Sequence, residues 1–217
     1  MEAYSIELYT ENQVKTYKIE VITKNFIAAL ERASLFAESR EESANYIKIN
    51  LNKNRNQVVT FYATNGRELY KHSYSNIIRP NSKIDIPFCY DNNIFIHQKH
   101  VKKILALKKS KSKFLTVSIK KGGSGYLYVI GDGVSVSCFS VPLNPLRLDY
   151  DNLLVECRVD HITNPAQGFT LNVDSLARIT KAMKGYDLRF YFGEKPTSPV
   201  YIATDDNACH ILMTTCV

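Results

Sequence analysis

Lysines dominate the stretch from His97 to Lys121, which holds nine of them and no acidic residue. On a helix, Lys99, Lys102 and Lys103 share one face, because their spacings are three and four residues. An ammonium group binds phosphate as a point charge without fixed geometry, which suits contact with a nucleic-acid backbone regardless of base sequence. The alternative interpretation is a solvated surface helix without a partner, since exposed lysines are common.

A second basic cluster has the same character. Arg178, Lys181 and Lys184 follow one another at a spacing of three, which again places them on one helical face. A third helical stretch is less basic, because Glu31 opposes its two cations. The predicted DNA-contacting residues are Lys24, Arg32, Lys99, Lys102, Lys103, Arg178, Lys181 and Lys184.

Three amphipathic helices must position these cations. Their apolar periodicity predicts helices over 25–37, 97–109 and 174–184, each after a polar or extended lead-in and before strand-like segments. The predicted strands are 17–22, 46–51, 58–63, 70–75, 114–119, 126–130, 134–142, 188–192, 200–204 and 210–214. Such repeated units cannot bury an apolar face alone and must stack. We therefore predict an α+β fold of repeated β-α-β-β-β units, with helices on one face of antiparallel sheets.

The chain divides unevenly between these units. We expect a complete two-unit domain over 1–150, a linker over 151–165 that contains Asn164-Pro165, and a half-domain of one unit over 166–217. A half-domain leaves sheet edges open, and open edges favour association. We therefore expect a homo-oligomer.

Composition narrows the functional class. The 217 residues are 45% apolar and carry a formal charge of +7, which indicates a folded protein with a polyanionic partner. Five cysteines in no ligand-like spacing indicate a reducing cytoplasm rather than a disulfide framework or a zinc site. The amino terminus lacks the regions of a signal peptide, and no apolar run is long enough for a membrane span.

The remaining candidate sites have simpler explanations. His97 and His100 have a metal-like spacing but no carboxylate or thiol nearby, so phosphate contact or helix capping is preferred. The glycines of 121–125 lack the ending of a phosphate-binding loop, and Asp205-Asp206-Asn207 is better explained as a turn. Fourteen tyrosines and ten phenylalanines could stack on bases, but their alternation favours sheet packing. We predict no enzyme, no cofactor and no metal.

Three segments resemble one protein family. The first is Ala63-Thr64-Asn65-Gly66-Arg67-Glu68-Leu69, the second is Pro145-Leu146-Arg147-Leu148-Asp149-Tyr150, and the third is Ser198-Pro199-Val200 followed by Ile211 to Val217. In their residue types and in their order along the chain, these segments are similar to segments of the bacterial DNA polymerase III beta subunit, the sliding clamp. The resemblance covers roughly 17–154 as the middle domain and 166–217 as the latter half of the last domain. It implies that the first domain and the opening half of the last are missing.

The resemblance also implies a function. Clamps of this family form rings of six similar domains around duplex DNA, with basic helices lining the hole. DNA polymerase, the clamp loader and other clamp-motif proteins dock a short peptide into an apolar pocket. Carried over, that pocket consists of Thr64, Gly66, Arg67, Leu69, Ile211, Leu212, Met213 and Val217. This chain departs from the family where Asn65, Arg67 and Glu68 replace Asp, His and Arg, and where Thr214-Thr215-Cys216 lacks the usual Pro-Met-Arg.

These expectations define a leading hypothesis and two rivals. The leading hypothesis is a shortened, non-catalytic clamp that contacts or encircles duplex DNA, with four three-unit chains completing a twelve-unit ring. The first rival is a regulatory module that binds replication proteins or a host clamp without encircling DNA. The second is a nucleic-acid-binding domain of unrelated fold, which would show steep salt dependence and bind linear and circular DNA equally.

Overall fold

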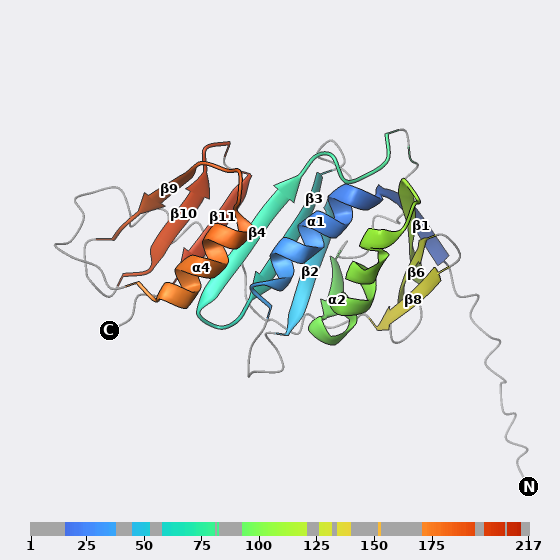
Figure 1. Cartoon of the computed structure of the whole chain (residues 1–217), viewed down its shortest axis with the longest axis horizontal. Helices are drawn as coiled ribbons and strands as arrows, with labels where there is room; N and C mark the ends of the chain where they lie inside the picture. The colour runs from blue at the N-terminus through green and yellow to red at the C-terminus, as the bar shows by residue number, and fades with distance from the viewer. Residues whose placement is uncertain are drawn as a thin grey trace, which may run out of the picture.

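In a computed structural model, the described part of the chain contains two antiparallel sheets and three α-helices (Figure 1). The structure describes residues 16–37, 45–52, 58–80, 82, 93–120, 126–131, 134–139, 152, 171–193, 198–206 and 208–213. The predicted linker 151–165 lies outside this part except for Asn152. No helix among the described residues is both long enough and apolar enough to cross a membrane.

The elements fall into three successive units. The first contains β1 (Thr16–Ile22), α1 (Thr23–Ser34), β2 (Tyr46–Asn52), β3 (Val58–Thr64) and β4 (Glu68–Tyr74). The second contains β5 (Asn93–His97), α2 (Gln98–Leu105), a 3-10 turn, η2 (Ala106–Lys109), and the strands β6 (Phe114–Lys120), β7 (Tyr126–Gly131) and β8 (Val134–Phe139). The third contains α4 (Val173–Ala182), β9 (Leu188–Tyr191), β10 (Val200–Thr204) and β11 (Cys209–Met213). The predicted repeat is therefore confirmed as an order of elements.

The first two units exchange their opening strands. Strand β1 of the first unit pairs with β6 of the second, and β5 of the second unit pairs with β2 of the first, both antiparallel. The result is a four-stranded sheet, β1-β6-β7-β8, and a seven-stranded sheet, β5-β2-β3-β4-β11-β10-β9. Because each unit supplies a strand to its neighbour's sheet, neither unit is complete without the other.

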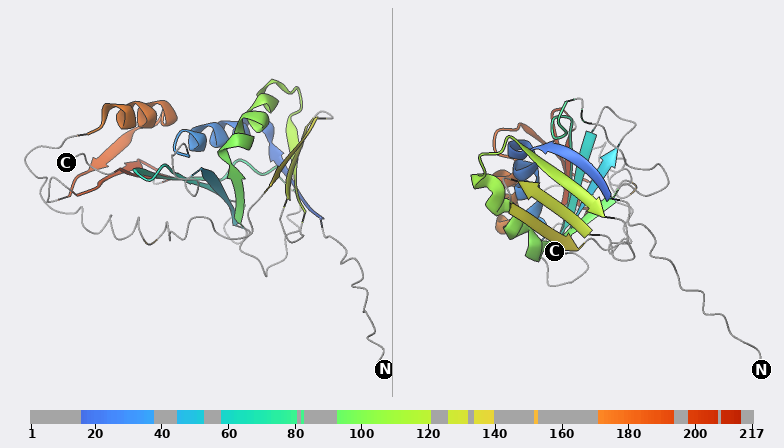
Figure 2. Two further views of the ribbon diagram at one scale, coloured as in Figure 1. Left: turned by 90° about the horizontal axis from the view of Figure 1, so that it is seen from below. Right: turned by 90° about the vertical axis from the view of Figure 1, so that its right-hand side faces the viewer.

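The third unit joins the seven-stranded sheet through its last strand. Strand β11 pairs antiparallel with β4, so that Leu212 lies opposite Leu69 and Ile211 lies opposite Tyr70. All three helices lie on the same side of the molecule, as both views of Figure 2 show. The expectation of helices on one face of antiparallel sheets is confirmed.

The helices begin differently from the sequence prediction. We predicted that the first helix starts at residue 25, but α1 already begins at Thr23 and its N-cap, Ile22, has no side-chain hydrogen bond. The Thr23 hydroxyl instead donates to the carbonyl of Ser112 at 2.8 Å, which ties α1 to the segment before β6. For α2 the expected capping is confirmed, because Nδ1 of His97 accepts from the amide of Lys99 at 3.1 Å.

The apolar core lies between the helices and the sheets. It includes Phe26 and Leu30 of α1, Val101 and Ile104 of α2, and Ile179 of α4, all almost fully buried. These residues follow the helical period, which is why the amphipathic stretches could be recognised from the sequence. The apolar run of β5 was not predicted as a strand; its edge pairing with β2 becomes evident only in the sheet.

Candidate functional site

The lysines predicted to contact DNA form an exposed surface on the helix side of the molecule. Lys99, Lys102 and Lys103 of α2 are exposed, whereas Val101 and Ile104 of the same helix are buried. The other exposed lysines of this surface are Lys24 of α1, Lys181 of α4 and Lys184 just after α4. Because the three helices share one side, these charges create one positive face (Figure 2).

Arg32, unlike the lysines, is bound to other residues within the protein. Its Nη1 donates to the hydroxyl of Tyr186 at 2.9 Å, and its guanidinium lies 4.9 Å from the centre of that ring. Burial alone would lower the pKa of Arg32, but hydrogen bonds to the hydroxyls of Tyr186 and Tyr74 outweigh it and raise the pKa. Arg32 therefore joins α1 to the third unit.

Arg178 is also engaged within the protein. Its Nη2 donates to Oε1 of Glu68 at 2.6 Å and its Nε donates to Oε2 at 3.2 Å, so the guanidinium binds the carboxylate with two parallel hydrogen bonds. Glu68 is only 1% exposed. The pair links α4 to the start of β4, and most of the cationic charge of Arg178 is compensated by a carboxylate.

The pKa of Glu68 reflects this pairing. Burial would raise the pKa, but hydrogen bonds from Arg178, Ser175 and Asn65 outweigh burial and lower it. Oδ1 of Asn65 also accepts from the amides of Arg67 and Glu68, at 3.0 and 2.8 Å. Gly66 completes this turn with φ of 85°, a conformation that glycine adopts without strain. The motif over 63–69 is therefore anchored to α4.

The residues of the predicted peptide pocket are divided between two faces of the sheet. Leu69 and Leu212 are paired neighbours on the face away from the helices. Ile211 and Met213 point to the helix side and are each 1% exposed, because side chains alternate along β11. Thr64 is buried, with its hydroxyl donating to the carbonyl of Glu68 at 2.8 Å.

Two further pocket residues, Gly66 and Arg67, are exposed in the turn before β4. The last predicted pocket residue, Val217, lies outside the described residues. The structure thus brings Leu69 and Leu212 together, while Ile211 and Met213 belong to the core.

An apolar cluster that the sequence did not predict surrounds Leu69 and Leu212. This outer-face cluster consists of Tyr62, Leu69, Tyr191, Tyr201, Ala203 and Leu212, from five strands of the seven-stranded sheet. The hydroxyl of Tyr201 is hydrogen-bonded to Nδ1 of His210 at 2.5 Å. The tyrosines were assigned to sheet packing, which is confirmed for Tyr62 and Tyr201, but their convergence depends on the β4–β11 pairing and has no local sequence signal.

On the helix side, the junction of the first and third units is aromatic. The rings of His72 and Tyr74 are stacked 4.0 Å apart, and Tyr186 meets His72 edge-on at 5.5 Å. The hydroxyl of Tyr70 contacts both Nδ1 of His72, at 3.3 Å, and the hydroxyl of Tyr74, at 3.2 Å. Burial, and then the positive charge of Arg32, lower the pKa of His72 to about 4. His72 is therefore neutral at pH 7.

Because of His72, the free energy of unfolding should decrease as the pH is lowered. Its pKa is 6.5 when unperturbed and about 4 in the folded protein, so between these values the unfolded chain binds the proton first. From pH 7 to pH 5 the expected loss is about 2 kcal/mol of unfolding free energy. A His72→Phe variant should lack this component when urea unfolding is measured at both pH values. Equal pH dependence in the two proteins would contradict the assignment.

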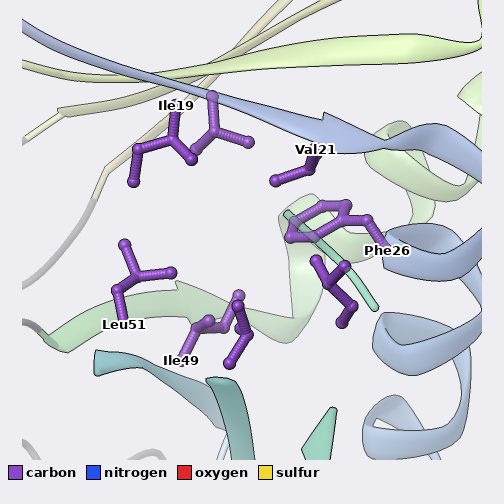
Figure 3. A pocket seen from close by; sticks show the side chains of 8 residues that line it. Ile19, Val21, Phe26, Ile49 and Leu51 are labelled. Atoms are coloured by element: carbon purple, nitrogen blue, oxygen red, sulfur yellow. The ribbon is translucent and has the colours of Figure 1, made fainter. Parts of the chain in front are cut away.

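The core also contains a small apolar hollow between the two sheets. Side chains from β1, α1 and β2 point into it (Figure 3). It is lined by Ile19, Val21, Phe26, Ile49, Leu51, Val59, Ile77 and Val117. Ligand sites combine apolar walls with a few polar groups that orient the ligand, and this lining has no polar side chain. Among the described residues, no group of three or more His, Cys, Asp or Glu is arranged to hold a metal ion.

Solved structures of bacterial sliding clamps have the same fold. The DNA polymerase sliding clamp from Pseudomonas aeruginosa matches with a TM-score of 0.65 and 11% identity, covering 99% of this chain and 70% of that chain. The DNA polymerase III beta chain from Streptococcus pneumoniae matches with a TM-score of 0.67 and 13% identity, covering 99% and 69%. The Helicobacter pylori beta clamp bound to a DNA ligase peptide matches with a TM-score of 0.63 and 13% identity, covering 97% and 68%.

Sequence comparison alone gives no match: no family model and no curated protein matches this chain. The chain has the sliding-clamp fold and spans about 70% of the length of the clamps it matches. The resemblance inferred from three short motifs is therefore confirmed at the level of the fold.

Proposed function

We propose that this chain, which has the fold of the bacterial sliding clamps, is a clamp-like processivity factor that encircles duplex DNA without sequence specificity. The observation that carries the proposal is the positive helix face, where five exposed lysines on three helices that share one side are joined by Lys184 just after α4. Lysine ammonium groups in this arrangement suit transient contacts with phosphate, and transient contacts allow a ring to slide. As a hypothesis, four chains of three units each form the ring.

Partner docking is assigned to the outer-face cluster. Its paired leucines, Leu69 and Leu212, lie on the face away from the helices, so a bound peptide would not compete with DNA. The exposed turn residue Arg67 lies two residues before Leu69. The partners proposed are a DNA polymerase, a clamp loader or other clamp-motif proteins. We propose that Ile211 and Met213 support this surface from beneath, as core residues.

To test whether the protein encircles DNA as a closed ring, its retention on circular duplex is compared with its retention on linear duplex. Chains dissociated by dilution are reassembled in the presence of nicked circular duplex, and the complex is washed at high salt to remove direct phosphate contacts. We expect retention on the circle and release when a restriction enzyme linearises it, as seen by gel filtration. Equal retention on both DNA forms would overturn encirclement and favour simple DNA binding.

The same experiment addresses the regulatory alternative. A protein that is retained on neither DNA form, yet binds an immobilised polymerase or host clamp, would be an interaction module and not a ring. A Leu212→Asp variant provides the control for docking, because Leu212 is the more exposed of the two paired leucines: it should lose polymerase binding while its retention on circular DNA is unchanged. The described lysine surface and Leu212 lie on opposite faces, so the two activities are separable.

A further inference from the structure

Among the described residues, the third unit lacks two contacts that complete the first and second units. In those units, the opening strands are exchanged and the helices pack side by side. The helix contact includes a hydrogen bond from Nε2 of Gln98 to the carbonyl of Ser34, at 3.2 Å, and an ion pair between Lys108 and Glu31, at 3.0 Å. Each unit thereby covers the open side of the other.

Within the described residues, the corresponding side of the third unit is open. Strand β9 is the last strand of the seven-stranded sheet, whereas its counterpart β2 is covered by β5. Figure 1 shows β9 at the end of the sheet, beyond α4. The helix α4 meets the first unit on its other side, through Arg178 and Glu68.

The open side is apolar. Phe190 of β9 is paired with Ile202 of β10, and since Ile202 belongs to the helix-side core, Phe190 points to the helix side as well. Its side chain is nevertheless 38% exposed, one of only two large apolar residues that are exposed in the described part of the chain. Leu188 on the same face of β9 is partly buried. An exposed apolar side chain beside an open strand edge is a typical association surface.

We propose that this surface, formed by β9 and the adjoining side of α4, binds the third unit of a second copy of this chain. The occupant follows from the pairing rules inside the chain, where a unit is completed by another unit. The helices α1 and α2 already pack on each other and β11 is already paired with β4, so among the described elements α4 and β9 of another copy are the helix and neighbouring strand that remain. Two identical surfaces meeting in this way form a closed twofold interface.

This contact repeats the kind of helix-and-sheet contact already present between the first two units, and it specifies how the proposed ring is assembled. Two chains joined at their third units contain six units, which form three pairs. Among the described strands β8 ends the four-stranded sheet, and this end is then available to join two such dimers into the ring of four chains. The inference therefore rests on the proposed ring for its stoichiometry, but not for the contact itself.

The experiment compares the solution mass of three full-length proteins in the absence of DNA. Phe190→Glu places a charge on the proposed interface, and Arg189→Gln is the matched control on the opposite face of the same strand. For a chain of 24.7 kDa we expect the wild type and Arg189→Gln at four chain masses, and Phe190→Glu at two or fewer. A Phe190→Glu protein that keeps the wild-type mass would overturn the proposal.

Hydrogen exchange of the wild type gives a second measurement that needs no variant. The amides of Leu188–Tyr191 that point away from β10 should be protected in the oligomer and lose protection on dilution, together with the mass. Protection of these open-edge amides that is independent of concentration would contradict the interface. If the third-unit contact is observed but the protein is released from circular DNA, the contact is supported and the proposed ring is overturned.

Discussion

Replacing Arg178 with methionine is expected to lower the free energy of unfolding by about 3–5 kcal/mol at pH 7. The variant leaves the carboxylate of Glu68 buried with only Asn65 and Ser175 as partners. A buried charge without its counter-ion is among the costliest single defects in a folded protein. Urea unfolding, followed by circular dichroism, measures the loss.

Two controls separate this effect from a general change of the helix. Lys181→Met removes an exposed cation from the same helix and should change stability by no more than about 0.5 kcal/mol. The double variant Arg178→Met with Glu68→Gln removes both charges and should recover most of the loss, because no unpaired charge remains. A single Arg178→Met variant within 1 kcal/mol of the wild type would show that the pair is not important for stability.

The second large effect is expected on DNA affinity. Reversing Lys99, Lys102 and Lys103 to glutamate should weaken binding to duplex DNA on the order of 100-fold near 0.15 M salt, if each lysine accounts for about one phosphate contact. The dependence of log affinity on log salt should become shallower by about 2.7, since each contact contributes about 0.9. Fluorescence anisotropy over a salt series measures both quantities.

The matched control reverses three lysines elsewhere on the protein. Lys18, Lys48 and Lys71 lie on the faces of the sheets that point away from the helices. Each reversal changes the charge by two, so both triple variants fall from +7 to +1. If the control weakens binding as much as the helix variant, net charge and not the positive helix face determines affinity.

Arg178 is also a case in which the structure changes a functional expectation. Its spacing with Lys181 and Lys184 groups the three as DNA contacts, but Arg178 is only partly exposed and is bound to Glu68. The two lysines of this group remain exposed. We therefore expect Lys181 and Lys184 to contribute to DNA affinity, and Arg178 to contribute to the rigidity of the junction between the first and third units.

That junction has a consequence for the proposed docking surface. The turn over 64–68 is held from the helix side by Arg178 and continues directly into Leu69, on the opposite face. Loss of the ion pair should therefore disturb the outer-face cluster as well as global stability.

The local pattern of the sequence was sufficient to predict the three helices, most strands and the exposed position of the lysines, but not the internal partners of Arg32 and Arg178. Apolar residues such as Val101 and Ile104 recur with the helical period, and the lysines between them must then point outward. These relations depend on neighbours within one or two helical turns, so they hold independently of how the rest of the chain folds. The order of three short motifs was sufficient to indicate the clamp fold, although no sequence comparison detects it.

Only the tertiary structure decided which strands pair, and the composition of both surfaces depends on that pairing. Glu68 and Arg178 are 110 residues apart, and nothing in either local segment indicates that they meet. Likewise, Ile211, Leu212 and Met213 are consecutive, but alternation along β11 sends the middle residue to one face and its neighbours to the other. The physical reason is that strand pairing and register are long-range properties, set by the packing of whole units and not by the residues of one segment.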